Sequence, residues 1–217
     1  MRLPNECKTM ITSTEPNNKP MMRSLLLTFA VLLFTACATP EDPLDDLVEI
    51  DAATLFDAPP VTAATRANKE AVDRGKYLIE LLGCGACHTD GALSGVPNMQ
   101  AWLAGSRIGI AYNNPIDYRR PGVVFPPNIT PDVETGIGGW SRNQVAAAIR
   151  GGAGRHGAGG IVVMPWQGYA KLSDEDTYAM VDYLKSIEPV HLITPEKVPP
   201  GQRTSHDFVY FGVYWTR

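Results

Sequence analysis

Two cysteines and a histidine stand close together near the middle of the chain, in the run Cys84-Gly85-Ala86-Cys87-His88. With two residues between them, both thiols lie on one turn of a helix and reach the same edge of a bound group. The adjacent histidine is then placed under the centre of that group. Cys-x-x-Cys-His is the pattern of c-type haem attachment, in which the thiols bond the haem and the histidine ligates its iron.

Two other chemistries also use a Cys-x-x-Cys pair. A redox-active dithiol follows a strand, whereas Cys84 follows a helical pattern. A zinc site needs a second pair of ligands at suitable spacing, and no cysteine follows Cys87. The remaining two cysteines, Cys7 and Cys37, stand in the N-terminal region. The predicted cofactor is therefore one haem c, covalently bound through Cys84 and Cys87.

The second axial position of the iron has several candidate ligands. Met164 precedes a proline in a loop after a glycine-rich stretch, and a thioether stabilises Fe(II), as suits an electron carrier. His156, inside the glycine-rich stretch, is the alternative, and a pair of histidines would lower the potential. Met180 stands on the apolar stripe of a helix and is predicted to pack in the core. His191 and His206 are expected to face solvent.

Two segments with helical periodicity are predicted to pack together around the motif. Residues 69–83 carry apolar side chains at helical intervals, interrupted by Gly75. Glycine costs a helix about 1 kcal/mol relative to alanine, which indicates the close approach of another element. The expected partner is the helix at residues 173–187, which begins with the capping residue Ser173 and a run of acidic residues.

A third helix is predicted between two residues of functional interest. It begins at Ser141, with Gln144 at the capping-box position, and ends where two glycines follow Arg150. Trp140, directly before this helix, either donates its indole N–H to a haem propionate or fills the core beside the haem. Arg150 either pairs with a propionate or is solvated.

These features resemble a class I cytochrome c, in which the first and last helices cross at a glycine. Further segments resemble the cytochrome subunits of periplasmic alcohol and sugar dehydrogenases: residues 128–132, 135–138, 140–141, 164–166 and 172–176. The resemblance covers about residues 69–190 and is less clear over 92–124. It implies an all-α fold, a cytochrome c-like helical domain with long loops wrapped round one haem. It also implies that Ile129 contacts the haem and that Met164 is the sixth ligand.

The N-terminus has the pattern of an export signal. Arg23 precedes an apolar stretch at residues 25–34, which is too short to span a bilayer. Phe34-Thr35-Ala36-Cys37 resembles a bacterial lipobox, so residues 1–36 are predicted to be removed and Cys37 to be acylated. Simple cleavage beside Cys37 is the alternative. The true start of translation is expected at one of the two adjacent methionines, Met21 or Met22.

Charge separates the rest of the chain into a tether and a domain. The net charge is −4, and residues 38–68 hold seven acidic residues and one basic residue, Arg66. Residues 37–68 are therefore predicted to be a solvated, lipid-anchored tether. From residue 69 onward acidic and basic residues are equal in number, which gives no basic surface for nucleic acid. Residues 69–190 are the predicted cytochrome domain, and residues 191–217 an extension packed on it.

The expected function is one-electron transfer rather than catalysis. The predicted partners are redox proteins, namely a dehydrogenase, a cytochrome complex or an oxidase, and the membrane through the lipid anchor. The predicted location is the periplasmic side of a Gram-negative envelope, with the outer membrane favoured because Ala38 follows Cys37. Electron exchange is expected at the haem edge beside the thioether bonds. The alternatives are a haem subunit of a larger membrane complex, and a haem enzyme or sensor with an exchangeable sixth ligand.

Overall fold

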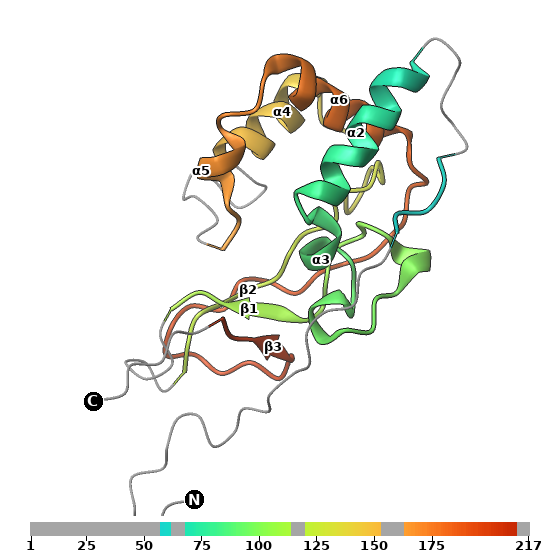
Figure 1. Ribbon diagram of the computed structural model, residues 1–217. Coiled ribbons are helices and arrows are strands. Elements are labelled where there is room, and N and C mark those ends of the chain that lie inside the picture. The colour runs from blue at the N-terminus through green and yellow to red at the C-terminus, as the bar shows by residue number, and fades with distance from the viewer. Residues whose placement is uncertain (1–56, 62–67, 114–119, 153–162, 212–217) are drawn as a thin grey trace, which may run out of the picture. The chain divides into compact units, whose positions relative to one another are not determined.

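The computed structural model describes residues 57–61, 68–113, 120–152 and 163–211. The predicted signal segment, Cys37 and His156 lie outside these described residues. The elements, in chain order, are α2 (Lys69–Leu81), α3 (Cys84–His88), η1 (Ala92–Ser94), η2 (Met99–Ala101), β1 (Gly109–Ala111), β2 (Val123–Val124), α4 (Arg142–Gly151), α5 (Trp166–Tyr169), α6 (Asp174–Ser186) and β3 (Phe208–Val209). Helices predominate, so the all-α prediction is confirmed only in part, because a small sheet is also present (Figure 1).

Helices α2 and α6 pack against each other at Gly75, as the sequence predicts. A Cβ added to Gly75 would lie 2.0 Å from the carbonyl oxygen of Ala179 and 2.8 Å from Cβ of Tyr183. Both distances are far below van der Waals contact, so only glycine allows the two helix backbones to approach this closely. The crossing buries Val72 and Ile79 of α2.

The predicted helix starts are confirmed for α4 and α6. The Ser141 hydroxyl accepts from the Gln144 amide, and the Gln144 side chain accepts from the Ser141 amide, which completes a capping box. Gly152 ends α4 with a φ of 59°, in the left-handed region that favours glycine. At α6 the Ser173 hydroxyl accepts from the amide of Asp176. Both helices lie on the same side of α3 (Figure 1).

The sheet joins the middle of the chain to its C-terminal segment. Its strand order is β2-β1-β3, with β1 antiparallel to β2 and parallel to β3. Val198 adds an isolated antiparallel bridge to Val123, with N···O distances of 2.8 and 2.9 Å. The described part of the predicted extension, residues 191–211, therefore packs on the domain.

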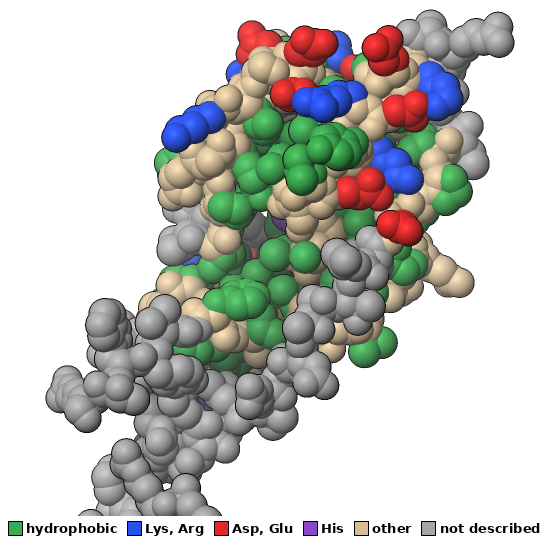
Figure 2. All heavy atoms as spheres, in the orientation of Figure 1, with side chains coloured by type: hydrophobic (Ala, Val, Ile, Leu, Met, Phe, Trp, Pro, Cys, Tyr) green, Lys and Arg blue, Asp and Glu red, His purple; other side chains and the backbone are tan. Residues whose placement is uncertain are grey.

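Hydrophobic side chains surround a hollow in the described part of the chain, and charged side chains gather over the helices (Figure 2). In the core, the Trp102 indole N–H donates to the hydroxyl of Tyr183 over 2.9 Å. Tyr183 is fully buried, and Trp102 directly follows η2 in the chain. Within the described ranges, no helix has the length and apolar character needed to cross a membrane.

Candidate haem site

Helix α3 carries the Cys-x-x-Cys-His motif and is fixed from both sides. Gly83, with a φ of 69°, turns the chain between α2 and α3. Gly85 faces the Trp102 ring, and a Cβ there would lie 2.1 Å from the nearest ring carbon. A glycine at the second motif position therefore lets the helix lie flat against that indole.

The two thiols of α3 are in environments that favour the protonated form. Burial, and after it the neighbouring Cys87, raise the pKa of the Cys84 thiol to about 12. Burial also raises the pKa of Cys87. Dithiol exchange depends on a thiolate, which these surroundings disfavour. In the described ranges, no group of three or more His, Cys, Asp or Glu side chains is placed to hold a metal ion.

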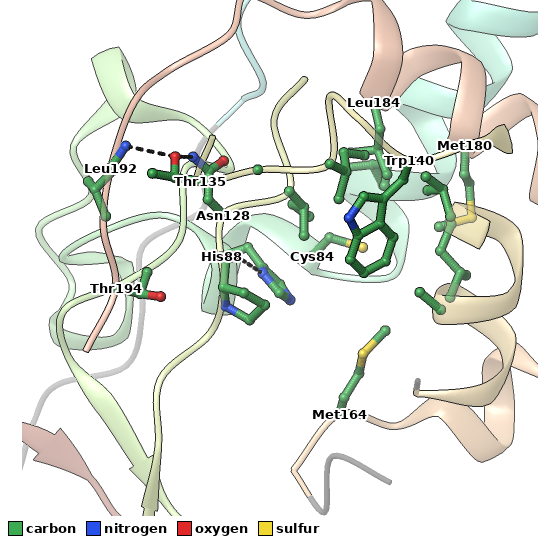
Figure 3. Close-up of a pocket in the computed structure, with 18 of the residues that line it drawn as sticks. Cys84, His88, Asn128, Thr135, Trp140, Met164, Met180, Leu184, Leu192 and Thr194 are labelled. Atoms are coloured by element: carbon green, nitrogen blue, oxygen red, sulfur yellow. Dashed lines mark hydrogen bonds between the residues drawn. The ribbon is translucent and has the colours of Figure 1, made fainter. Parts of the chain in front are cut away.

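His88 is held with one ring nitrogen occupied and the other available. Its Nδ1 lies 2.8 Å from the carbonyl oxygen of Pro127, which can only accept, so Nδ1 carries the proton. Burial lowers the pKa of His88, although the bond to Pro127 acts in the opposite direction. The ring is thus a neutral imidazole whose Nε2 has a lone pair for a metal. In Figure 3 the ring extends into the cavity beside Cys84.

A cavity of about 420 Å³ lies beside α3. This volume is within the range of about 300–1,000 Å³ that small-molecule and cofactor sites occupy. Apolar side chains form most of its wall, among them Ile79, Ile129, Ile137, Trp140, Val145, Ile149, Met164 and Leu184. A flat apolar group bonded to the thiols of α3 fits this lining, since burial of apolar surface stabilises it.

Met164 lies opposite the motif, in the loop before α5. It lines the cavity together with Cys84 and His88, and all three also line a smaller adjoining pocket that includes Cys87. Figure 3 shows the Met164 side chain extending into the cavity. Met180 reaches the cavity as well, but it is 1% exposed on α6 and belongs to the core. Of the two predicted ligands, the structure places only Met164, because His156 is outside the described residues.

Trp140 and Ile129 both line the cavity. The loop that carries Trp140 is held by Lys185 of α6. Its ammonium group donates to the carbonyl oxygens of Ile137, Gly138 and Trp140, at 2.5, 3.1 and 2.7 Å.

Arg150 is not among the residues that line the cavity. Its guanidinium group donates to the Thr177 hydroxyl at 2.9 Å and to the Leu172 carbonyl at 2.8 Å, and it pairs with Asp174. These contacts tie the end of α4 to the start of α6. The structure therefore gives Arg150 a role in helix packing, and its predicted contact with the cofactor has no support in this arrangement.

Sequence reasoning did not single out two parts of the cavity wall. Pro127 orients His88, although the only signal for it is its place next to the segment 128–132. Residues 191–196 were predicted only as part of an extension packed on the domain, and His191, Leu192, Ile193, Thr194 and Glu196 of this segment line the cavity. Their position depends on long-range hydrogen bonds, such as that from the Asn128 side chain to the Val190 carbonyl at 2.7 Å.

Comparison with known proteins agrees with this site. The family model for cytochrome c matches residues 72–188. The cytochrome c subunit of a quinone-dependent alcohol dehydrogenase from Gluconobacter oxydans is 36% identical over 130 residues, 59% of this chain and 24% of that protein. The fructose dehydrogenase cytochrome subunit of Gluconobacter japonicus is 32% identical over 135 residues, 62% of this chain and 25% of that protein. The gluconate 2-dehydrogenase cytochrome c subunit of Pantoea cypripedii is 36% identical over 129 residues, with coverages of 59% and 26%. The chain spans about a quarter of the length of these relatives.

Proposed function

Because the chain belongs to the cytochrome c family, we propose that it carries single electrons through one haem c. Cys84 and Cys87 would bond the haem, and His88 and Met164 would ligate its iron. The observation that carries this proposal is that Cys84, His88 and Met164 line one apolar cavity, with the His88 ring fixed by Pro127. The haem supplies the Fe(III)/Fe(II) couple, and the chain sets its potential and its access to partners.

The side chains around the cavity have distinct parts in this proposal. The carbonyl of Pro127 keeps the proton of His88 on Nδ1 and strengthens the imidazole as a ligand. The thioether of Met164 favours the reduced state. Trp140, Ile129 and the other apolar walls exclude water, which keeps the surroundings similar in both oxidation states.

The similar dehydrogenase subunits support a partner class. Each of the three relatives is, by name, the cytochrome subunit of a dehydrogenase. We therefore propose a dehydrogenase or a cytochrome complex as the electron donor and an oxidase or another cytochrome as the acceptor. The proposed location is the periplasmic side of the envelope, with Cys37 as the lipid anchor. A subunit role in a larger membrane complex is the second candidate, and the same relatives favour it.

Spectra of the haem-loaded protein test the axial ligands. The wild-type chain is produced with haem-maturation machinery, and Met164→Leu is compared with Met99→Leu, a matched change in η2. We expect the weak long-wavelength absorption band of Met–Fe(III) ligation in the wild type and in Met99→Leu. In Met164→Leu the band disappears, the potential falls and carbon monoxide binds, because the sixth position is open.

Three results would overturn parts of the proposal. Persistence of the band in Met164→Leu would exclude Met164 as the ligand. A wild-type protein without the band, and with the spectrum of two nitrogen ligands, would favour His156. A high-spin wild-type protein that binds carbon monoxide readily would instead favour an enzyme or a sensor.

A further inference from the structure

Exposed acidic and apolar side chains from two segments lie at one side of the cavity. The two segments form an acidic rim, and its members are Asp132, Val133, Glu134, His191, Ile193 and Glu196. Glu134, His191, Ile193 and Glu196 line the cavity itself. Val133, next to Glu134 in the chain, and Ile193 are each 74% exposed, so both offer apolar surface to solvent.

Hydrogen bonds hold the two segments of the acidic rim together. The Asn128 side chain donates to the Thr135 hydroxyl at 2.8 Å and to the Val190 carbonyl at 2.7 Å. The amide of Leu192 donates to the Thr135 hydroxyl at 3.3 Å. Figure 3 shows Asn128, Thr135, Leu192 and Thr194 together on one side of the cavity. The rim therefore has a fixed geometry, which lowers the entropic cost of binding a partner there.

The rim carries more negative than positive charge. Asp132 accepts from the amide and the hydroxyl of Thr135, and these bonds lower the pKa of its carboxyl group. Glu134 and Glu196 add two exposed carboxylates. His191 lies 3.7 and 3.6 Å from the carboxylates of Asp132 and Glu134, and it carries charge only when protonated. The nearby Lys197 has its ammonium group 4.7 Å from the centre of the Tyr112 ring.

The side of the site next to Cys87 has a smaller pocket among the described residues. The small pocket there has a volume of about 60 Å³ and is walled by Ile110, Val124 and Phe125 of the sheet region. The acidic rim, by contrast, borders the main cavity directly.

We propose that the acidic rim is the docking surface for a redox partner whose contact face is apolar at its centre and ringed by Lys and Arg. This inference rests on the proposed function. Complementary charge steers the encounter, and Val133 and Ile193 provide a small apolar contact. A small apolar contact suits the brief complexes of electron-transfer proteins.

Oxidation of the reduced, haem-loaded protein by two small probes of opposite charge tests the docking surface. Tris(phenanthroline)cobalt(III) is a trication with apolar ligands, and ferricyanide is an anion. With the cobalt probe one electron leaves the iron, which becomes Fe(III), and Co(III) becomes Co(II). Glu134→Gln is compared with Glu70→Gln, in the exposed first turn of α2, and Val133→Ser with Val96→Ser, at an equally exposed valine.

We expect Glu134→Gln to slow the cobalt reaction about 3- to 10-fold at an ionic strength of about 10 mM, where the Debye length is about 30 Å. The effect vanishes at about 1 M salt, where the Debye length is about 3 Å. Val133→Ser slows the cobalt reaction at both salt concentrations, because its contact is apolar. The Glu70 and Val96 variants leave the rates unchanged, and Glu134→Gln does not slow the ferricyanide reaction.

Equal rates in the rim variants and their matched controls would overturn the docking surface while leaving electron transfer intact. A chain that takes up no haem, or is not reduced, would overturn the proposed function itself. The two failures are distinguished by the reduced spectrum, recorded before any probe is added.

Discussion

Lys185 shapes the candidate site although it does not line the cavity. Its ammonium group lies among the carbonyl oxygens of Ile137, Gly138 and Trp140. Burial lowers its pKa, so the charge is retained there at a cost, offset by three charge-assisted hydrogen bonds. One side chain of α6 thereby fixes the loop that carries Trp140 in the cavity wall.

Replacement of Lys185 by methionine is expected to loosen that loop. Lys185→Met keeps the length of the side chain but removes the donor, and the carbonyls lose their only shared partner among the described residues. We expect a loss of about 1–3 kcal/mol in the free energy of unfolding, measured with urea. A change in the absorption spectrum of the haem is expected as well, because the loosened loop carries Trp140, which lines the cavity.

Lys171→Met provides the control, because Lys171 is exposed beyond α5. It should change the free energy of unfolding by less than about 0.5 kcal/mol, as surface substitutions usually do. Equal effects of the two substitutions would show that the carbonyl contacts of Lys185 contribute nothing specific.

At the scale of elements, the helices were predictable because their signals are local. Ser141 with Gln144, Ser173 with its acidic neighbours and Gly75 each specify a cap or a crossing within a few residues. The strands were not predictable. Strands of two or three residues show no alternation, and β1 pairs with residues about 100 positions later.

The same contrast holds for the candidate site. The residues that the motif and its loop signals identified, Cys84, His88 and Met164, do line one cavity. Pro127 and residues 191–196 were missed because their role comes from contacts across the fold. A carbonyl oxygen that orients a histidine has no signature in the side-chain sequence.

The sheet is expected to depend on Val198, which joins the C-terminal segment to β2. Its amide donates to the Val123 carbonyl at 2.8 Å, and proline has no amide hydrogen. Val198→Pro should therefore cost about 1–3 kcal/mol in the free energy of unfolding, since the Val123 carbonyl loses its donor. Val198→Ala, which keeps the amide, separates this effect from the loss of side-chain contacts.

Unfolding followed by the haem absorption and by hydrogen exchange at Val123 tests the Val198 prediction. We expect Val198→Pro to shift both signals more than Val198→Ala does, because the segment that it anchors also walls the cavity. An unchanged haem transition in Val198→Pro would mean that the sheet unfolds independently of the haem site.

At the scale of the whole chain, the acidic segment and the predicted lipid-anchor site both precede the haem domain. Acidic residues are concentrated between residues 38 and 68, whereas the chain from residue 69 onward has equal numbers of acidic and basic residues. Ala58 is buried and its amide donates to the Glu80 carboxylate at 2.9 Å, so the chain already contacts the domain at this point. An anchor at Cys37 would then hold the haem domain close to the membrane and raise its concentration near membrane-bound partners.

Removal of the acylation site tests this arrangement. In a bacterial host, Cys37→Ser is expected to move the protein from the membrane fraction to the soluble fraction, because two or more acyl chains are needed for stable anchoring. Its haem spectrum and its rates with soluble probes should stay unchanged, since the described haem site lies elsewhere in the chain. Cys7→Ser, in the segment predicted to be removed, should remain with the membrane. A Cys37→Ser protein that also remains there would exclude the lipid anchor, and the membrane association would then belong to a protein partner.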